Sequence, residues 1–596
     1  MKRIFRSLLP LAVVAAAACA GPAANNSGGA DGDDTAARLK AFNALLDEQW
    51  QYTLQDAPEF ATILGDYRYN DKVSDLSLEH VQAQLQKNQD FLKRFQAVDT
   101  RGFSEQDRLS QQLMVEQLQD AIRGTELKNE EMPLDQFNGF HLQAAQFVSV
   151  VPFDSTQHYE DYLARLHQMP KEVEQVIALC RAGEKDGLMP PKFLLHKVAQ
   201  QIRAIAKPAG EANVFGQPVA KFPDAVPQGE RKRLHDAILK AVDTEVRPAF
   251  AHLAGFVSKE YAPKGRAEPG LWSLPDGDAR YRFAIHSQTT TDMTPEQIHD
   301  LGLAEVKRIE GEMGDIATRL HYKDLKTMRA KLKTDPKVHA TSRQQIVDLY
   351  TKYIAQMQPK LPELFGLLPK TEVKVVAVQQ YREKEAAAAE YNQGTPDGAR
   401  PGMVYVNTGD YQHRSLLPIE DTAYHEGVPG HHMQISIAQT LPGLPPFRQQ
   451  AGYNAYVEGW ALYAERLGKE IGFYQDPLSD YGRLQADIWR AIRLVVDTGV
   501  HSQHWTRPQM VDFFHDHSSE DEPDIQAETD RYIAWPAQAC AYKLGQLKIL
   551  ELREKAKKEL GAKFDIRAFH DEILDGGALP LDVLDTRVSG WIAAQK

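Results

Sequence analysis

The spacing of hydrophobic residues along the chain predicts a protein built mainly of α-helices. From residue 36 onward, apolar positions recur every three or four residues, which is the repeat of one buried helical face. One such face consists of Leu39, Phe42, Leu46 and Trp50, and another of Ile298, Leu301, Ile309 and Met313. The second face follows the sequence TPEQ at 294–297, which predicts a helix start because its threonine and glutamine can form a capping box.

Two short segments favour β-strands instead. Residues 373–378 and 403–407 are rich in β-branched residues, and a glycine- and proline-rich loop at 394–402 lies between them. We expect the two segments to pair into a small sheet, against whose edge an extended peptide could bind. The loop is interpreted either as a mobile cover or as a solvated connection. We predict an N-terminal helical scaffold at 36–290 and a region that carries the chemistry at 291–596.

The first residues are typical of an export signal. Residues 1–19 combine basic residues at the start with a short apolar stretch, so we predict a signal peptide. Cys19 fits the lipidated cysteine of a lipoprotein, and the alternative is cleavage before Gly21 at an A-x-A site. We favour the lipoprotein because residues 20–35 are typical of a flexible linker. The predicted location is the periplasm, with attachment to the outer membrane through Cys19.

Composition excludes some classes of function. The net charge of -13 and the pI near 5.9 argue against a nucleic-acid partner, which normally requires a basic surface. After the N-terminus no apolar run reaches the 18 residues that a membrane span requires. Cys180 and Cys540 are far apart in the sequence, and we expect two buried free thiols rather than a disulfide. The sequence carries no signal for an oligomeric state.

Residues 425–432, with the sequence HEGVPGHH, point to metal chemistry. Neutral imidazoles bind Zn²⁺, and a neighbouring carboxylate such as Glu426 can accept a proton from a metal-bound water. The usual pattern H-E-x-x-H places two histidines one helical turn apart, but here Pro429 stands where the second histidine is expected. Proline lacks the N–H that continues a helix, so we expect a bulge or kink within the motif.

A bulge of two extra residues would bring His431 to the place of the second ligand, beside His425. His432 would then face the substrate or an acid behind the ligands, although it remains the alternative ligand. The preferred third ligand is Glu458, on a predicted helix that follows a proline-rich turn, and the alternative is that Glu458 is an ordinary paired carboxylate. Glu465 shares its helical face but lies about 10 Å further along, so it is expected to support a ligand or pair with a base.

Three motifs together resemble the bacterial DUF885 family, from about residue 40 to the C-terminus. They are the HExxPGHH pattern at 425–432, an EGWAxY pattern that begins at Glu458, and an RYxxxPxQAxxYKxG pattern that begins at Arg531. Residues 494–501, with the sequence LVVDTGVH, also match. Ala537 stands where glycine is expected. A more distant similarity extends to helical zinc peptidases such as thimet oligopeptidase, angiotensin-converting enzyme and Taq carboxypeptidase.

The resemblance implies a mainly α, gluzincin-like metallopeptidase fold, with a small β-sheet beside the zinc helix and a deep substrate cleft. By similarity to the converting-enzyme group, Tyr532 is expected to donate a hydrogen bond to the oxyanion, with Tyr542 as the second candidate. Charge type and family position suggest Lys543 or Arg531 as the partner of a substrate carboxylate. His501 and Asp497 are spaced by one helical turn, and they are interpreted either as a pair supporting the site or as core packing.

These features predict a zinc-dependent peptide hydrolase with one Zn²⁺ per chain, of the oligopeptidase, dipeptidase or carboxypeptidase type. Zn²⁺ on His425, His431 and Glu458 would activate a water, Glu426 would accept its proton, and the water would attack a peptide carbonyl. Two alternatives stay open: a catalytically silent protein that binds peptides or envelope components, and a zinc hydrolase of another amide or ester. The presence of Glu426 favours an enzyme, because a binding protein has no need of a general base.

Overall fold

The computed structural model describes residues 29–596 except 380–382, 384–385, 397 and 399. The predicted signal peptide and Cys19 lie outside the described residues, as do parts of the loop at 394–402. The described chain is mainly helical with one small sheet, which confirms the expected fold class at this level. None of the described helices is both long and apolar enough to cross a membrane.

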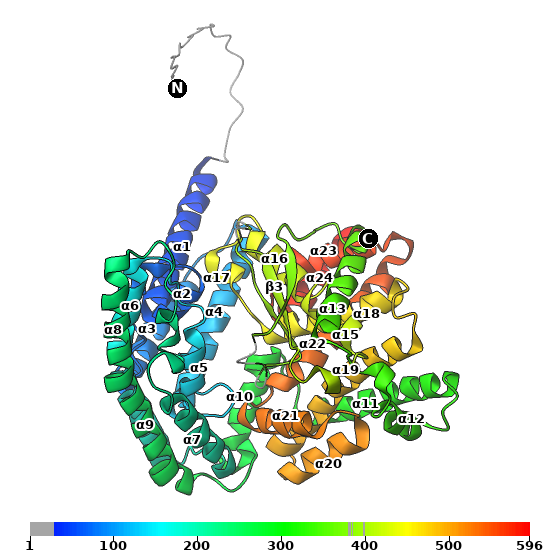
Figure 1. Ribbon diagram of the computed structural model, residues 1–596. Helices are drawn as coiled ribbons and strands as arrows, with labels where there is room; N and C mark the ends of the chain where they lie inside the picture. Colours follow the sequence, from blue (N-terminus) through cyan, green and yellow to red (C-terminus); the bar gives the residue numbers. More distant parts are fainter. Residues whose placement is uncertain (1–28, 380–382, 384–385, 397, 399) are drawn as a thin grey trace, which may run out of the picture.

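The first ten helices form the part of the molecule that lies mostly on the left in Figure 1. Their bounds are α1 Gly29–Asp56, α2 Pro58–Ile63, α3 Leu78–Gln96, α4 Glu105–Glu126, α5 Phe140–Phe147, α6 Thr156–Asp186, α7 Lys192–Ala206, α8 Gln228–Ala241, α9 Arg247–Phe256 and α10 Gly277–Thr289. Helix α1 begins inside the predicted linker at 20–35, so residues 29–35 are helical rather than a flexible tether. Arg38 fixes this helix by binding Asp34 and the carbonyl oxygens of residues 99 and 101.

The later helices surround the sheet on the right in Figure 1. Their bounds are α11 Pro295–Arg319, α12 Leu325–Leu332, α13 Arg343–Met357, α14 Leu361–Leu364, α15 Ile419–Glu426, α16 His431–Thr440, α17 Pro446–Gln449, α18 Asn454–Glu470, α19 Pro477–His501, α20 Arg507–His517, α21 Glu522–Ala534, α22 Gln538–Leu560, α23 Ile566–Leu574 and α24 Leu581–Gln595. Helix α11 starts with the predicted capping box, in which Thr294 and Gln297 bind each other's backbone N–H groups.

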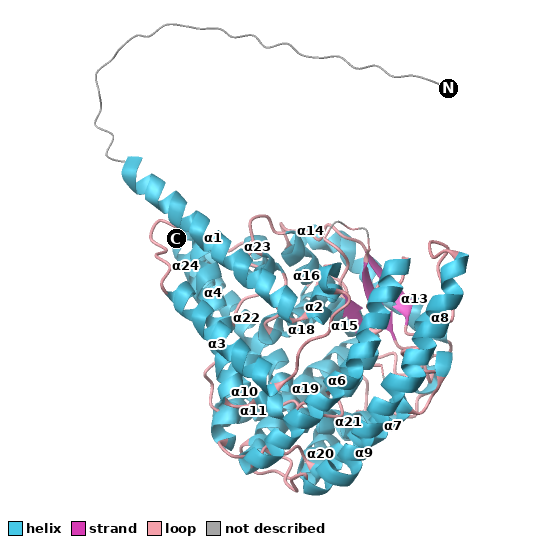
Figure 2. Ribbon diagram, turned by 90° about the vertical axis from the view of Figure 1, so that its left-hand side faces the viewer, coloured by secondary structure: helices cyan, strands magenta, loops and turns pink. Residues whose placement is uncertain are grey.

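The three strands form a single mixed sheet beside α13 and α15 (Figure 2). The predicted pair is present: β1 (Val373–Ala377) lies parallel to β3 (Gly402–Val406), with Val375 opposite Val404. The strand β2 (Ala389–Asn392) was not expected, and it pairs antiparallel with the other side of β3. The order β1-β3-β2 leaves β2 at one edge, close to the candidate metal residues.

The largest hydrophobic core joins residues from both predicted regions. Phe42 and Phe95, from α1 and α3, belong to the same buried cluster as Tyr424 and Trp460, from α15 and α18. The first helices therefore pack directly onto the helices that carry the candidate site. The division at residue 290 stays a prediction. Cys180 and Cys540 are both buried and free, as expected.

Helices α18 and α22 cross at two glycines, and this contact positions the candidate site. A Cβ atom on Gly545 would lie 1.7 Å from the carbonyl oxygen of Ala455, and one on Gly459 would lie 2.4 Å from Gly545. Because a side chain cannot fit at either position, the two backbones come unusually close. Glu458 is adjacent to this crossing on α18, and Tyr542 lies about one turn before it on α22.

Candidate metal centre

The motif at 425–432 is broken into two helices rather than bulged. Helix α15 ends at Glu426 and α16 begins at His431, so the expectation of one bulged zinc helix was wrong in its detail. Pro429 cannot donate a helical hydrogen bond, and its carbonyl oxygen instead accepts one from Trp460 Nε1 at 2.8 Å. A Cβ on Gly430 would lie 2.0 Å from the carbonyl oxygen of His425, so only glycine allows this tight turn.

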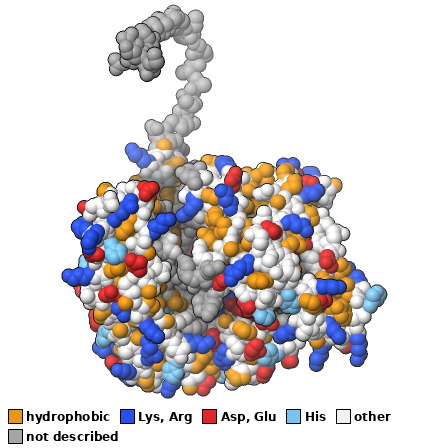
Figure 3. All heavy atoms as spheres, in the orientation of Figure 1, with side chains coloured by type: hydrophobic (Ala, Val, Ile, Leu, Met, Phe, Trp, Pro, Cys, Tyr) orange, Lys and Arg blue, Asp and Glu red, His pale blue; other side chains and the backbone are white. Residues whose placement is uncertain are grey.

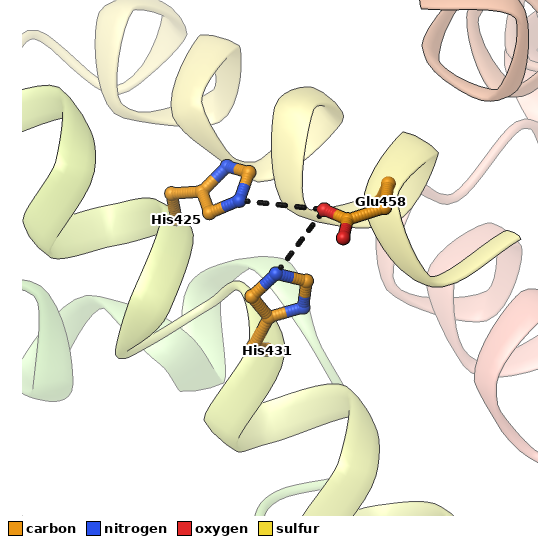
Figure 4. A group of neighbouring side chains, drawn as sticks. All are labelled: His425, His431 and Glu458. Carbon is orange, nitrogen blue, oxygen red and sulfur yellow. Dashed lines mark ion pairs between the residues drawn. The ribbon is translucent and has the colours of Figure 1, made fainter. Parts of the chain in front are cut away.

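The break brings His425 and His431 together, with Glu458 facing both from α18 (Figure 4). Nε2 of His425 lies 3.6 Å from Oε2 of Glu458, and Nε2 of His431 lies 3.4 Å from the same oxygen. Four tetrahedral ligands at zinc-bond distance are separated from one another by about 3.3 Å. The three side chains therefore have the spacing that a shared zinc ion requires.

The buried atoms of this group support the same interpretation. Within the described part of the chain, His425, His431 and Glu458 are the one group of three or more potential ligands whose atoms converge, all within 4.8 Å. Oε2 of Glu458 is buried and makes no hydrogen bond to any described residue. An uncompensated buried carboxylate oxygen is unfavourable unless a cation binds it. The residues present thus fit a zinc ion.

The electrostatics of the site favour a bound cation. Burial would lower the pKa of His425, but Glu458, Glu465 and Glu426 together raise it to about 10. Burial would raise the pKa of Glu458, but His431 and His425 hold it well below its usual range. Glu458 is therefore a carboxylate, and the negative potential that favours a proton on His425 equally favours a divalent metal ion.

Glu465 lies behind His425, in the supporting position that was one of the two expectations for it. Its Oε1 atom is 2.7 Å from Nδ1 of His425, and the carboxylate is almost completely buried. The nearest base is Arg490, whose Nη2 atom lies 3.8 Å away, whereas Arg466 binds Glu470. A proton on Nδ1 directed at Glu465 leaves Nε2 of His425 free to face Glu458, which is the orientation that metal binding needs.

His432 points away from the other two ligands. Its Nδ1 atom lies 3.0 Å from the hydroxyl of Tyr391, on β2, and its Nε2 atom lies 3.1 Å from the carbonyl oxygen of Thr371. Burial lowers the pKa of His432 to about 4, so the ring is neutral near pH 7. The geometry therefore favours His431 over His432 as the second ligand. His432 fastens α16 to the sheet instead of facing an acid.

Glu426 directly follows His425 at the end of α15 and is 9% exposed. Its charge contributes to the raised pKa of His425, and it also raises the pKa of the buried Tyr350. The charge of Glu426 thus acts on the first of the candidate ligands. A carboxylate at this position can serve as a general base.

Tyr532 is fully buried, and its hydroxyl already has three partners. It donates to Oε2 of Glu528 at 2.6 Å and accepts from Nε of Arg493 at 2.8 Å and from Nε1 of Trp489 at 3.1 Å. Arg531 is similarly engaged, because it binds both carboxylate oxygens of Glu528 and also Gln538. Neither Tyr532 nor Arg531 is therefore free to bind a substrate.

Tyr542 is half-buried, and the charge of Glu458 acts on its hydroxyl. Burial raises its pKa, the charge of Glu458 raises it further, and Arg493 and Arg531 oppose this. The guanidinium of Arg493 covers the Tyr542 ring, 4.5 Å from its centroid. The second candidate for hydrogen-bond donor is therefore placed better than the first.

Lys543 and His501 have structural surroundings. Lys543 is fully buried and donates to Asp487 at 2.5 Å and to Gln546 at 2.8 Å, so it cannot reach a substrate carboxylate. His501 accepts from the N–H of Leu271 at 3.1 Å and lies 3.0 Å from the carbonyl oxygen of Tyr532. It does not pair with Asp497, which instead accepts from Tyr281 and from the N–H of Ala537.

Sequence reasoning missed the two arginines of α19 and the glutamate of α21 that lie around the tyrosines. Arg490 and Arg493 stand within an otherwise apolar stretch of α19, and Arg493 is 8% exposed. Buried arginines are rare unless they are paired, so charge within this apolar stretch was a usable signal. Ala537 has a φ of 65°, in the left-handed region that favours glycine, which explains why glycine is expected at this position.

The deep substrate cleft that the family resemblance implies stays a prediction. The described residues line a cavity of about 240 Å³ between α11, α18, α19 and α22, with walls that include Glu305, Arg308, Arg483 and Asp487. None of the three candidate ligands lines it. Figure 3 shows one face of the molecule, over which basic and acidic side chains are interspersed rather than separated.

Comparison with known proteins gives one family and several similar solved structures. The model of the family DUF885, described as a bacterial protein of unknown function, matches residues 58–588. A crystal structure of a "putative lipoprotein" from Colwellia psychrerythraea is similar with a TM-score of 0.88 and 29% identity, over 94% of this chain and 99% of that one. A second such protein, from Shewanella oneidensis and of unknown function, shares the fold with a TM-score of 0.71 and 18% identity, over 92% and 99%. No curated protein matches this sequence.

Proposed function

We propose that this protein, which belongs to the DUF885 family, is a zinc-dependent peptide hydrolase. The observation that carries the proposal is the convergence of His425, His431 and Glu458 at zinc-ligand spacing, with Glu426 directly after His425 in the chain. Two imidazoles and one carboxylate are the ligand set of many catalytic zinc sites, which keep a fourth position open. A purely structural zinc site would normally have four protein ligands.

Zinc bound to these residues would supply a Lewis acid that polarises a carbonyl group and lowers the pKa of water. Glu426 accepts a proton from the attacking water and then delivers it to the departing amine. Glu465 holds the ring of His425 through the hydrogen bond to Nδ1, so that Nε2 keeps its orientation during the reaction.

Tyr542 is the proposed donor to the oxyanion that forms as water attacks. Tyr542 lies on α22, the helix that crosses α18 directly beside Glu458, and Arg493 holds its ring. A positioned donor of this kind contributes about 100-fold or more to the rate. Tyr532 supports this arrangement indirectly, because its hydroxyl binds the Arg493 side chain.

The edge strand β2 is the proposed place for an extended substrate. It lies at one end of the order β1-β3-β2, and its Tyr391 contacts His432, the residue after a proposed ligand. An exposed strand edge offers main-chain hydrogen bonds to a peptide of any sequence. This arrangement favours peptides over other amides or esters.

The proposed location is the periplasm, with a lipid on Cys19. The N-terminal sequence supports this proposal, and both structural relatives are named as candidate lipoproteins. Globomycin treatment, which blocks lipoprotein signal cleavage, should cause the uncleaved precursor to accumulate. Normal maturation in its presence would instead favour cleavage at the A-x-A site.

Reconstitution with zinc tests the enzymatic proposal. Protein stripped with a chelator should cleave peptides of a mixed library only after one equivalent of Zn²⁺ is added, and mass spectrometry would identify the cleaved bonds. His431→Ala should lose zinc binding and cleavage together, whereas His413→Ala, on the surface, should behave as wild type. Zinc binding without cleavage of any peptide would favour the binding-protein alternative.

A further inference from the structure

Arg493 is a buried arginine whose hydrogen bonds are incomplete. Its Nε atom donates to Tyr532 and its Nη2 atom lies 3.1 Å from Glu528, but its Nη1 atom has no hydrogen-bond partner among the described residues. The residue is 8% exposed, so bulk solvent does not satisfy this group. A buried N–H donor without a partner is unfavourable, and each such group calls for an explanation.

The unpartnered end of Arg493 belongs to the surroundings of the candidate metal site. Its guanidinium carbon lies 4.5 Å from the centre of the Tyr542 ring, 5.7 Å from Tyr532 and 5.7 Å from Trp489. Tyr542 in turn lies one turn from the glycine crossing that places Glu458. Arg493 therefore contacts a tyrosine on α22, one turn from the point where this helix crosses α18 beside Glu458.

The other partners of Arg493 fix its position but make no hydrogen bond to Nη1. Glu528 is shared with Arg531, which binds both of its oxygens, so this one carboxylate faces two guanidinium groups. The local balance of these three residues is one excess positive charge. An anion near Nη1 would complete both the charge balance and the hydrogen bonds of Arg493.

We propose that Arg493, together with Tyr542, forms a subsite for the free C-terminal carboxylate of the substrate. This inference rests on the proposed peptide hydrolysis and deepens it, because it assigns the protein to carboxypeptidase or dipeptidase action rather than internal cleavage. One residue of extended chain spans at most about 3.6 Å. A carboxylate recognised beside Tyr542 therefore belongs to one of the first residues after the cleaved bond.

Arg493 can bind a substrate carboxylate, whereas Lys543 and Arg531 cannot. Both of those cations are saturated by protein carboxylates and amides, whereas Arg493 keeps one donor free. The planar guanidinium can bind a carboxylate through parallel N–H groups, which a lysine cannot do. Recognition of the chain terminus would thus depend on a residue of α19 that none of the three sequence motifs contains.

Matched peptides test the subsite directly. Zinc-loaded wild type should cleave a peptide with a free C-terminus about 100-fold faster, in kcat/KM, than the same peptide with an amidated C-terminus. The amidated peptide has no terminal carboxylate to accept a hydrogen bond from Nη1 of Arg493. Arg493→Gln should lose this preference, mainly through a higher KM for the free acid. A third peptide, amidated but ending in aspartate, distinguishes the terminal carboxylate from a side-chain carboxylate and should be cleaved slowly.

Two further variants separate recognition from structural support. Arg553 is a matched control, because it is also 8% exposed and also binds a tyrosine hydroxyl and a glutamate, on the far part of α22. Arg553→Gln should keep the preference for free C-termini. Arg493→Lys, which retains the charge beside Glu528, should fold even if Arg493→Gln does not, and should lose most of the preference.

Binding measured without turnover completes the test. Calorimetry on Glu426→Gln should detect binding of the free-acid peptide, and the affinity for the amidated peptide should be roughly 100-fold weaker. Equal cleavage of free and amidated peptides by wild type would overturn the subsite but leave the peptidase proposal intact. Rapid cleavage of the aspartate amide would also overturn it. Cleavage of none of the peptides would count against the peptidase proposal itself.

Discussion

Oε1 of Glu465 lies 2.7 Å from Nδ1 of His425, so a buried carboxylate orients the first proposed zinc ligand. Glu465→Gln should lower zinc affinity by about 10- to 100-fold while the protein remains folded, because the charge behind the imidazole is lost. Competition with a fluorescent zinc chelator measures this. Glu551→Gln, an exposed glutamate on α22, provides the control and should bind zinc as wild type does. Unchanged affinity in Glu465→Gln would contradict the supporting role.

The crossing of α18 and α22 should tolerate no side chain. Gly545→Ala would place a methyl group 1.7 Å from the carbonyl oxygen of Ala455, so we expect destabilisation by about 1–3 kcal/mol or more. The control is Gly590→Ala in α24, where nothing lies within 4 Å and alanine should stabilise the helix by about 0.5–1 kcal/mol. Urea unfolding compares the two. Changes of the same sign in both variants would contradict the packing argument.

The two tyrosines should behave differently. On an amidated peptide, which leaves the carboxylate subsite empty, Tyr542→Phe should lower kcat by about 100-fold with little change in KM, because it removes a donor to the transition state. Tyr532→Phe should instead destabilise the protein, since it leaves Arg493, Glu528 and Trp489 each without one hydrogen bond. Steady-state kinetics and urea unfolding of both variants distinguish these outcomes. A larger loss of kcat in Tyr532→Phe would restore Tyr532 as the donor.

His501 should make stability depend on pH. Burial lowers its pKa to about 3, and the N–H of Leu271 donates to its Nδ1, so the folded state holds a neutral ring. The unfolded state binds a proton below about pH 6.5, and stability from this residue is therefore complete above that value and is lost as pH falls toward 3. The difference in unfolding free energy between wild type and His501→Gln should shrink by about 2 kcal/mol from pH 7.5 to pH 5.

A surface histidine serves as the control for this effect. His196 is exposed on α7, and solvent surrounds it in both folded and unfolded states. His196→Gln therefore supplies the same substitution at an exposed position, measured over the same pH range. A difference for His501→Gln that stays constant from pH 7.5 to pH 5 would contradict the buried neutral ring.

The sequence predicted much of the fold because its local signals agree with the packing. The capping box at Thr294 follows from the sequence TPEQ, and the two apolar faces that contain Phe42 and Ile309 follow from helical spacing, and all three are present. The strand β2 was missed because its sequence, AEYN, carries little strand preference and depends on pairing with β3. Tertiary contact, not local preference, creates this strand.

The candidate ligands were predictable, because histidines at this spacing beside a glutamate have few uses other than metal binding. His425, His431 and Glu458 converge as the motif suggested, although Pro429 and Gly430 break the helix instead of bulging it. The surroundings were less predictable, because the sequence does not indicate which cations are neutralised. Lys543 and Arg493 are both buried, and only the structure distinguishes the saturated cation from the one with a free donor.

The central claim is that Glu426 acts as a base beside a zinc ion. Metal analysis of purified wild type and Glu426→Gln, each assayed on a mixed peptide library, tests this most directly. We predict one zinc per chain in both proteins and cleavage by wild type alone, because the substitution removes the base without removing a ligand. Absence of zinc from both proteins after reconstitution, or equal cleavage by both, would contradict the account.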